Sequence, residues 1–411
     1  MYKTIIPKEF GFVKGDFPLT VELPDNPDQK PPKELKFKGR SRRRFNEYDV
    51  FHPVKVDKKT GELIAKPKSN TILAWEQHKA ASARIASRFY AIHHILKAEV
   101  QLARASGDHA TADRIALDAT KFFERGQRMY NCASFLQHGK CPDCGRAHTS
   151  SAILCRDRVC PTCNWRLSLQ QAVEMQNTLA LINDIDQYKA AFFCVTIKNC
   201  QPADLKGTLE RMSEAWNRLL NRKKPKRDFK GWARRVEITY NRETRTFHPH
   251  YHVILLIPAK HPDTLYDMAA MICEYWRSAL RLDYDPVTDF EWIEDLTAGG
   301  LDENAAPNLH KAILETFKYT IKDNELSEMP LDLFRQFVEQ IQNKRLTAYG
   351  GIIKEARAQL EYSDELDQEP QLSCGKCASP LLNRVIYRWS FASNTYERFE
   401  NIMISEGHKG A

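Results

Sequence analysis

Residues 248–257 read HPHYHVILLI, and this stretch decides how the middle of the chain folds. Its five consecutive apolar residues predict a strand buried in a sheet. Successive side chains of a strand point to opposite faces, so His248, His250 and His252 share one face. Imidazoles two residues apart can reach one cation, which predicts a metal site where the strand begins. Surface histidines on an edge strand, which Pro249 would suit, are the alternative.

The strand before this stretch carries a carboxylate. Residues 231–241 read GWARRVEITYN, and the short connection NRETR joins them to the histidine stretch as a hairpin. Glu237 points away from the face of its apolar neighbours Val236 and Ile238, so the hairpin would bring it across from the histidines. Because two histidines rarely complete a metal site, we expect Glu237 as the third ligand, with His248 as the competitor.

The strand and helix signals predict an α+β protein. Between residues 190 and 322 their order is β-α-β-β-α-β-α, which is typical of an antiparallel sheet with helices on one face. The last of these elements is a helix through NLHKAILETFKYTIK, and residues 325–360 also have a helical pattern. Residues 383–391, NRVIYRWSF, predict one further strand.

Changes in composition divide the chain into five segments. Residues 1–70 are rich in Pro, Lys and Arg, which is typical of a basic and largely disordered arm. Residues 71–131 are Ala-rich with apolar residues at helical spacing, which predicts a helical region. A zinc-binding segment at 132–165, a domain with the sheet at 166–360 and a C-terminal segment at 361–411 follow.

Length, charge and hydropathy limit the class of protein. The chain has 411 residues, enough for two or three domains, and a net charge of +8 at pH 7. No apolar run approaches the ~18 residues that span a membrane, and the N-terminus has no signal-peptide core. We therefore expect a cytoplasmic protein without a membrane partner, whose CxxC pairs are metal ligands rather than disulfides.

Two CPxC pairs separated by 15 residues predict a structural Zn²⁺ ion with four thiolate ligands. The expected ligands are Cys141, Cys144, Cys160 and Cys163. Cys132, Cys155 and His148 lie in the same segment and leave the ligand set open. The CGKC motif at 374–377 raises the alternative of a second zinc ion.

A tyrosine stands near the end of the predicted helix at ILETFKYTIKDNE. Helical spacing would place Glu315, Tyr319 and Lys322 on one face. Tyrosine can attack a phosphodiester and later leave as phenolate, a nearby lysine can stabilise the charge, and a glutamate can activate water. A plain amphipathic helix with a solvated charged face is the alternative.

A basic segment, NRKKPKRDFKGWARR at 221–235, interleaves Lys and Arg with Phe229 and Trp232. Basic side chains beside aromatic rings are typical of single-strand binding, whereas a solvated loop is the alternative. The DNA contacts expected in this segment are Lys223, Lys224, Lys226, Arg227 and Trp232. A second basic cluster lies at 42–44.

Three segments, taken in order, resemble a known family. They are FFCVTIKNC at 192–200, EITYN followed by HPHYHVILLI, and ETFKYTIK at 315–322. Together they resemble the replication initiators of small rolling-circle plasmids, in the HUH endonuclease superfamily. The resemblance is to the branch that has a single tyrosine and a glutamate one turn before it. It implies an antiparallel-sheet HUH endonuclease domain of ferredoxin/RRM-like fold at 166–360.

The resemblance also implies roles for the site residues. His250 and His252 would bind Mg²⁺ or Mn²⁺, and Tyr319 would nick DNA to give a 5′-phosphotyrosyl link and a 3′-OH primer. Glu315 would direct the water that ends the cycle, and Lys322 would be the supporting cation.

Further roles are implied outside the nicking centre. Lys198 and Asn199, with Thr196, mark the first motif and would contribute to the sheet and to DNA contact. The family's cysteine cluster corresponds here to Cys132, Cys155, Cys160 and Cys163.

The implied partners are origin DNA, single-stranded and duplex, with a host helicase and polymerase in a bacterial cytoplasm. A relaxase or transposase of the same superfamily is an alternative within enzymes. Tyr319 follows the histidines, which favours an initiator over a relaxase, and it stands alone, which disfavours a two-tyrosine transposase. A zinc-containing DNA-binding protein without nuclease activity is the alternative from another class.

Overall fold

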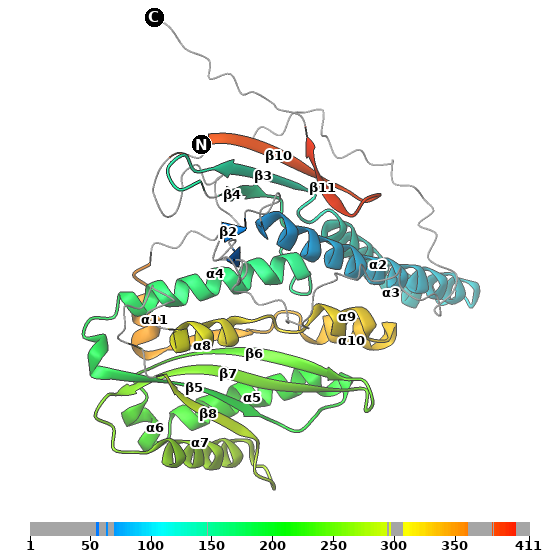
Figure 1. Cartoon of the computed structure of the whole chain (residues 1–411). Coiled ribbons are helices and arrows are strands. Elements are labelled where there is room, and N and C mark those ends of the chain that lie inside the picture. Colours follow the sequence, from blue (N-terminus) through cyan, green and yellow to red (C-terminus); the bar gives the residue numbers. More distant parts are fainter. Residues whose placement is uncertain are drawn as a thin grey trace, which may run out of the picture. The chain divides into compact units, whose positions relative to one another are not determined.

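The fold contains a five-stranded antiparallel sheet in the order β8-β5-β7-β6-β9, most of which is seen in the lower part of the view (Figure 1). The computed structural model describes residues 55–56, 63–64, 70–145, 147–293, 296, 307–360, 380 and 382–399. The strands of this sheet are β5 (Tyr188–Thr196), β6 (Gly231–Asn241), β7 (Thr246–Pro258), β8 (Thr288–Ile293) and β9 (Thr347–Gly350). None of the helices in these ranges has both the length and the apolar character that crossing a membrane requires.

Helices cover both faces of the sheet (Figure 1). The helices on one face are α5 (Leu205–Leu220) and α7 (Leu265–Leu280), and those on the other are α4 (Pro161–Ala180), α8 (Pro307–Phe317) and α11 (Gly351–Arg357). Val253 and Leu255 of β7 join the core with α5 and α7, whereas Ile254 and Leu256 join the core with α4 and α8. The prediction of helices on one face is therefore wrong, because consecutive apolar residues in β7 require cover on both sides.

The predicted order of strands and helices through α8 is confirmed, but the prediction of helix throughout 325–360 is wrong. This part contains α9 (Asp323–Glu328), α10 (Leu331–Gln340), β9 and α11. The basic segment contains a short helix, α6 (Lys223–Asp228), and two 3-10 turns are Ile185–Gln187 and Pro202–Asp204. Gly350 pairs with Trp232, so the chain after α10 adds the edge strand β9 to the sheet.

The predicted N-terminal helical region consists of two long helices, α2 (Asn70–Ala105) and α3 (His109–Tyr130). Asp108 caps α3 by accepting a hydrogen bond from the Thr111 N–H at 3.0 Å. Phe89 of α2 packs against Phe334 of α10 with ring centres 5.2 Å apart. The helical pair therefore shares its core with the elements around the sheet.

A second antiparallel sheet in the order β11-β10-β3-β4 joins the cysteine-rich segment to the C-terminal segment (Figure 1). Its strands are β3 (Phe135–Lys140), β4 (Ala147–Ala152), β10 (Leu382–Ser390) and β11 (Thr395–Phe399), and two short strands, β1 (Lys55–Val56) and β2 (Leu63–Ile64), pair separately. The predicted strand at 383–391 corresponds to β10. The basic arm at 1–70, including 42–44, lies almost entirely outside the described residues, as does the CGKC motif.

Candidate functional site

Glu237, His250 and His252 converge on one point of the sheet. The Nε2 atoms of His250 and His252 lie 3.0 Å and 2.7 Å from Glu237 Oε2. One donor atom from each residue lies within 4.8 Å of the others. Glu237 pairs directly with His250 in the β6–β7 hairpin, as the alternation of side chains predicted. We call these three residues the histidine cluster.

The pKa shifts of Glu237 and His252 suit a divalent cation. Burial raises the pKa of Glu237, but hydrogen bonds to both histidines and the charge of Lys318 outweigh it and hold the pKa well below its usual range. Burial lowers the pKa of His252 more than its bond to Glu237 raises it. An ionised carboxylate and neutral imidazoles are the ligating forms, so the donor set fits a metal ion.

His248 lies beside the histidine cluster but outside it. Its Nδ1 atom is 3.0 Å from Asn199 Oδ1, and the Asn199 amide donates to Thr246 Oγ1 at 2.8 Å. Asn199 therefore links the end of β5 to β7 and orients His248. Of the two competing third ligands, Glu237 is the one that the fold brings to His250 and His252.

A cavity of about 410 Å³ opens next to the histidine cluster. All three histidines line it, together with Glu315 and the sheet-face residues Cys194, Thr196, Asp289 and Glu291. The Cys194 thiol lies 3.1 Å from His252 Nδ1, and Glu315 Oε1 lies 4.0 Å from the same nitrogen. Glu315 is thus at the site, as predicted, and it reaches the site from the last turn of α8.

Lys318 is the cation of the site, and the sequence reasoning missed it. Its Nζ atom lies 2.7 Å from Glu237 Oε2 and also contacts Glu315. Burial lowers the pKa of Lys318, but the two carboxylates outweigh it, so the pKa lies above its usual value. Lys322, the predicted cation, is exposed and lies at the N-cap of α9. The available signal was the i, i+3 spacing of Lys318 from Glu315.

The helix prediction around Tyr319 is wrong, because α8 ends at Phe317. The chain then follows the open edge of β6, where the Ile238 N–H donates to the Thr320 carbonyl at 2.7 Å. Glu315, Tyr319 and Lys322 therefore do not share a helical face. Tyr319 is half-buried and packs against the larger core, one residue after Lys318.

Backbone pairing explains why the helix stops. Beyond β9, the amides of Val236, Ile238 and Tyr240 face no further strand within the described ranges. The Val236 N–H donates to the Leu346 carbonyl at 2.9 Å, and the Tyr240 N–H donates to the Glu325 carboxylate at 2.8 Å. Together with the bond from Ile238 to Thr320, these bonds satisfy the three amides in turn along β6. Satisfying buried amides outweighs one more helical turn.

Four cysteines form a second cluster, but they are not the four that the spacing of the CPxC pairs predicted. Cys132, Cys155, Cys160 and Cys163 have sulfur atoms within 4.8 Å of one another. They are the set that the family resemblance implied. Cys141 and Cys144 instead lie in the turn between β3 and β4. Spacing fails here because the β3–β4 hairpin turns the first pair away from the second.

The surroundings of the cysteine cluster fit a zinc ion bound by thiolates. Backbone N–H groups of Cys155 and Arg156 donate to Cys132 Sγ at 3.4 Å and Cys163 Sγ at 3.2 Å. Lys79 is 0% exposed, and burial lowers its pKa to about 8 although the charges of the neighbouring cysteines act to raise it. Zinc with four thiolates carries a net negative charge, which these N–H groups and this lysine would offset.

The part of the basic segment up to Trp232 lies at the far end of the hairpin from the histidine cluster. Gly231, where β6 begins, pairs with Leu256, whereas Glu237 pairs with His250, and six residues of strand span about 20 Å. The Trp232 ring packs 5.3 Å from Trp216, and Phe229 is buried, so both aromatic side chains belong to the core.

Acidic neighbours neutralise part of the charge of the basic segment. Lys198, another predicted DNA contact, lies outside this segment, after β5. Lys224 contacts Asp263, and Arg227 contacts Asp228 at 2.6 Å, while Lys223 and Lys226 are exposed. Lys198 follows β5 with its Nζ atom 3.9 Å from the centre of the Tyr284 ring. Because the Trp232 ring packs against Trp216, this packing does not support the predicted stacking of Trp232 on DNA bases.

A family model described as replication protein (Rep_1) matches residues 146–397, more than half of the chain. The chain belongs to this replication protein family. A relative named "Protein rep" from Bacillus amyloliquefaciens is 30% identical over 275 residues, covering 64% of this chain and 80% of the relative. A Bacillus sp relative of the same name is 29% identical over 273 residues, covering 63% and 88%. One from Streptococcus pneumoniae is 28% identical over 242 residues, covering 58% and 72%.

The match confirms the recognition of a plasmid rolling-circle replication initiator from the three sequence motifs. DNA at a replication origin is accordingly the partner of this replication protein. No solved structure matches the chain. The assignment to the single-tyrosine branch stays a prediction.

Proposed function

We propose that this replication protein nicks and rejoins one DNA strand at the origin, with Tyr319 as the nucleophile. The observation that carries the proposal is the histidine cluster, whose donor atoms lie within 4.8 Å of one another beside Lys318 and Glu315. The β-α-β-β-α-β order around the cluster supports an HUH endonuclease domain of ferredoxin/RRM-like fold. The cluster would hold Mg²⁺ or Mn²⁺, and that ion would supply polarisation of the scissile phosphate and stabilisation of the leaving oxygen.

The protein's own residues carry out the transfer. The Tyr319 hydroxyl attacks phosphorus and gives up its proton, while the bond from phosphorus to the 3′ oxygen breaks and that oxygen takes up a proton. The products are a 5′-phosphotyrosyl link and a 3′-OH that primes synthesis. Lys318, placed between Glu237 and Glu315, stabilises the developing negative charge.

The same geometry supports the reverse and terminating steps. The phosphotyrosyl link keeps the energy of the phosphodiester, so attack by a 3′-OH rejoins the strand and frees Tyr319. Glu315 lines the cavity, where its carboxylate takes a proton from the water that hydrolyses the link at the end of the cycle. Between nicking and this terminating step, a host helicase and polymerase would act on the strand that the 3′-OH primes.

The test uses the full chain, Mn²⁺ and a single-stranded oligonucleotide that contains the origin. We expect a covalent adduct with the wild type and with Tyr188→Phe, a matched tyrosine variant at the far end of β5, and no adduct with Tyr319→Phe. An adduct in Tyr319→Phe would refute the nucleophile. DNA binding without any adduct from the wild type would favour a DNA-binding protein without nuclease activity.

A further inference from the structure

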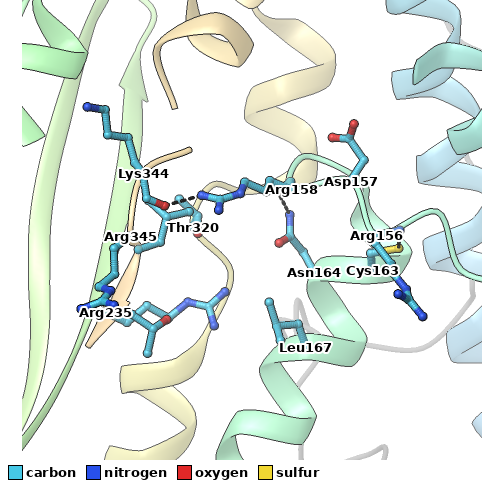
Figure 2. A pocket seen from close by; sticks show the side chains of 12 residues that line it. Arg156, Asp157, Arg158, Cys163, Asn164, Leu167, Arg235, Thr320, Lys344 and Arg345 are labelled. Atoms are coloured by element: carbon cyan, nitrogen blue, oxygen red, sulfur yellow. Dashed lines mark hydrogen bonds between the residues drawn. The ribbon is translucent and has the colours of Figure 1, made fainter. Parts of the chain in front are cut away.

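A second cavity, of about 360 Å³, lies between the cysteine-rich segment and the sheet (Figure 2). Its walls come from the start of α4, the loop before it, β6, the chain after α8 and the chain around β9. Its charged residues are Arg156, Asp157, Arg158, Arg235, Lys344 and Arg345. We call it the arginine cavity. The chain segments that supply these residues are far apart in the sequence, and Arg235 is the one charged residue that also belongs to the basic segment at 221–235.

The arginine cavity has a strong excess of positive charge. Asp157 is the acidic residue of the cavity lining, and its two carboxylate oxygens accept hydrogen bonds from the Arg125 guanidinium at 2.9 Å and 3.1 Å. Lys344 contacts Glu210 outside the cavity. The lining thus contains four arginines against one carboxylate that is itself paired with Arg125, a composition that suits an anion.

The cavity is held in place by fixed contacts. The Arg235 side chain is 3% exposed, and its Nη1 atom donates to Gln171. The Asn164 amide donates to the Arg158 carbonyl at 2.6 Å, and the Arg158 guanidinium donates to the Lys344 carbonyl (Figure 2). A buried guanidinium costs desolvation energy, which a bound anion would offset.

The cavity adjoins the proposed nicking centre. Arg235 pairs with His252 across the hairpin and stands two residues before Glu237 on the same face. Two residues of strand span about 7 Å, so one DNA strand can contact both places. Thr320, the residue after Tyr319, also lines the cavity.

We propose that the arginine cavity binds backbone phosphates of the DNA strand that is cut, and so positions that strand over the histidine cluster. The proposal rests on the proposed function for the identity of the strand. Guanidinium groups bind phosphate oxygens through paired N–H donors, and such contacts do not depend on base sequence. The part of the basic segment that precedes β6, residues 221–230, lies too far along the hairpin for this task.

The test measures the binding of full-length protein to oligothymidylate without divalent ion, over a range of salt concentrations. Loss of one phosphate contact lowers the slope of log K against log salt by about 0.7 for a single strand. We expect this change for Arg345→Ala, about twice as much for Arg156→Ala with Arg345→Ala, and a wild-type slope for Arg345→Lys. The matched control is Arg277→Ala. Arg277 lies on α7, is exposed and pairs with Asp285, so this variant should bind DNA like the wild type.

A second arm connects the cavity to the cut strand. Replacing phosphates beside the scissile phosphate with uncharged methylphosphonates should weaken the binding of an origin oligonucleotide to the Tyr319→Phe protein. In the double variant Tyr319→Phe with Arg345→Ala, the same replacement should cause no further loss of affinity. Wild-type salt slopes in both alanine variants would overturn the proposal, whether or not the protein nicks DNA. The proposal would also be overturned if polyglutamate bound more tightly than oligothymidylate and lost this affinity in Arg345→Ala. That result would indicate that the cavity binds an acidic protein segment. Failure of the covalent-adduct test would leave the salt slopes unaffected and would count against the nicking function alone.

Discussion

At the scale of single residues, the identity of the site's cation is the sharpest difference between sequence and structure. Lys318 touches Glu237 and Glu315, whereas Lys322 is exposed. Because a cation beside a metal ligand competes with the metal, Lys318→Gln should bind Mn²⁺ up to about tenfold more tightly, a gain of ~1.4 kcal/mol. Isothermal titration of the metal-free protein measures this affinity.

The matched control for this lysine is Lys322→Gln, which should leave Mn²⁺ affinity unchanged. Glu237→Gln should weaken Mn²⁺ binding by at least about tenfold, because it removes the anionic donor of the histidine cluster. Equal effects of the two lysine substitutions would contradict the role assigned to Lys318.

At the scale of elements, β9 depends on the absence of a side chain at one position. A Cβ at Gly350 would lie 2.3–2.5 Å from the Trp232 ring, so β9 would have to move away from β6. We expect Gly350→Ala to lower the free energy of unfolding by about 1–3 kcal/mol. Gly207→Ala in α5 meets no atom within 4 Å and should instead raise it by about 0.5–1 kcal/mol. Urea denaturation of both variants distinguishes these outcomes, and equal stabilities would refute the close approach.

The cysteine cluster joins α4 to the end of α3. Removing one thiolate with Cys155→Ser should lose one equivalent of zinc and about 3 kcal/mol of stability, seen as a fall of roughly 5–10 °C in Tm. Cys273→Ser, on α7, alters a thiol that donates to the Pro286 carbonyl at 3.5 Å, and it should keep both the zinc and the Tm. Zinc content comes from elemental analysis, and an unchanged content in Cys155→Ser would exclude this ligand set.

The hypothesis of a second zinc ion stays a prediction. Cys141 directly follows β3, whose last residue, Lys140, pairs with Leu382 of β10. The CGKC motif precedes Leu382 in the sequence by a few residues. Two equivalents of zinc per wild-type chain would support a second ion, and one equivalent would exclude it.

At the scale of the whole molecule, one continuous core links the helical pair, the second sheet and the histidine-bearing sheet. Trp389 of β10 belongs to this core and is 2% exposed. Trp389→Ala should therefore lower stability by about 3–5 kcal/mol while keeping a single unfolding transition. That transition should coincide with the loss of Mn²⁺ binding. Two separate transitions would show that the C-terminal strands and the histidine cluster belong to independent units.

Patterns within a few neighbouring residues are sufficient to predict the strands β5 to β8 and β10, the hairpin and the histidine cluster. The alternation of side chains in β7, together with the hairpin to β6, is enough to place Glu237 opposite His250. The predictions fail where a segment's conformation depends on a distant partner. The chain after Phe317 leaves the helix to satisfy the edge of β6, and β9 exists only because β6 offers it an edge.

The family, the order of elements from β5 to α8 and the residues of the histidine cluster all follow from the amino-acid sequence, because each depends on short-range periodicity or on motifs in a fixed order. Which lysine reaches Glu237, where the basic groups gather and which of the two cysteine sets left open by the sequence comes together are instead decided by the folded chain. Those three results depend on contacts between residues far apart in the sequence. Burial and hydrogen bonding of the whole fold select such contacts, and no local pattern records them.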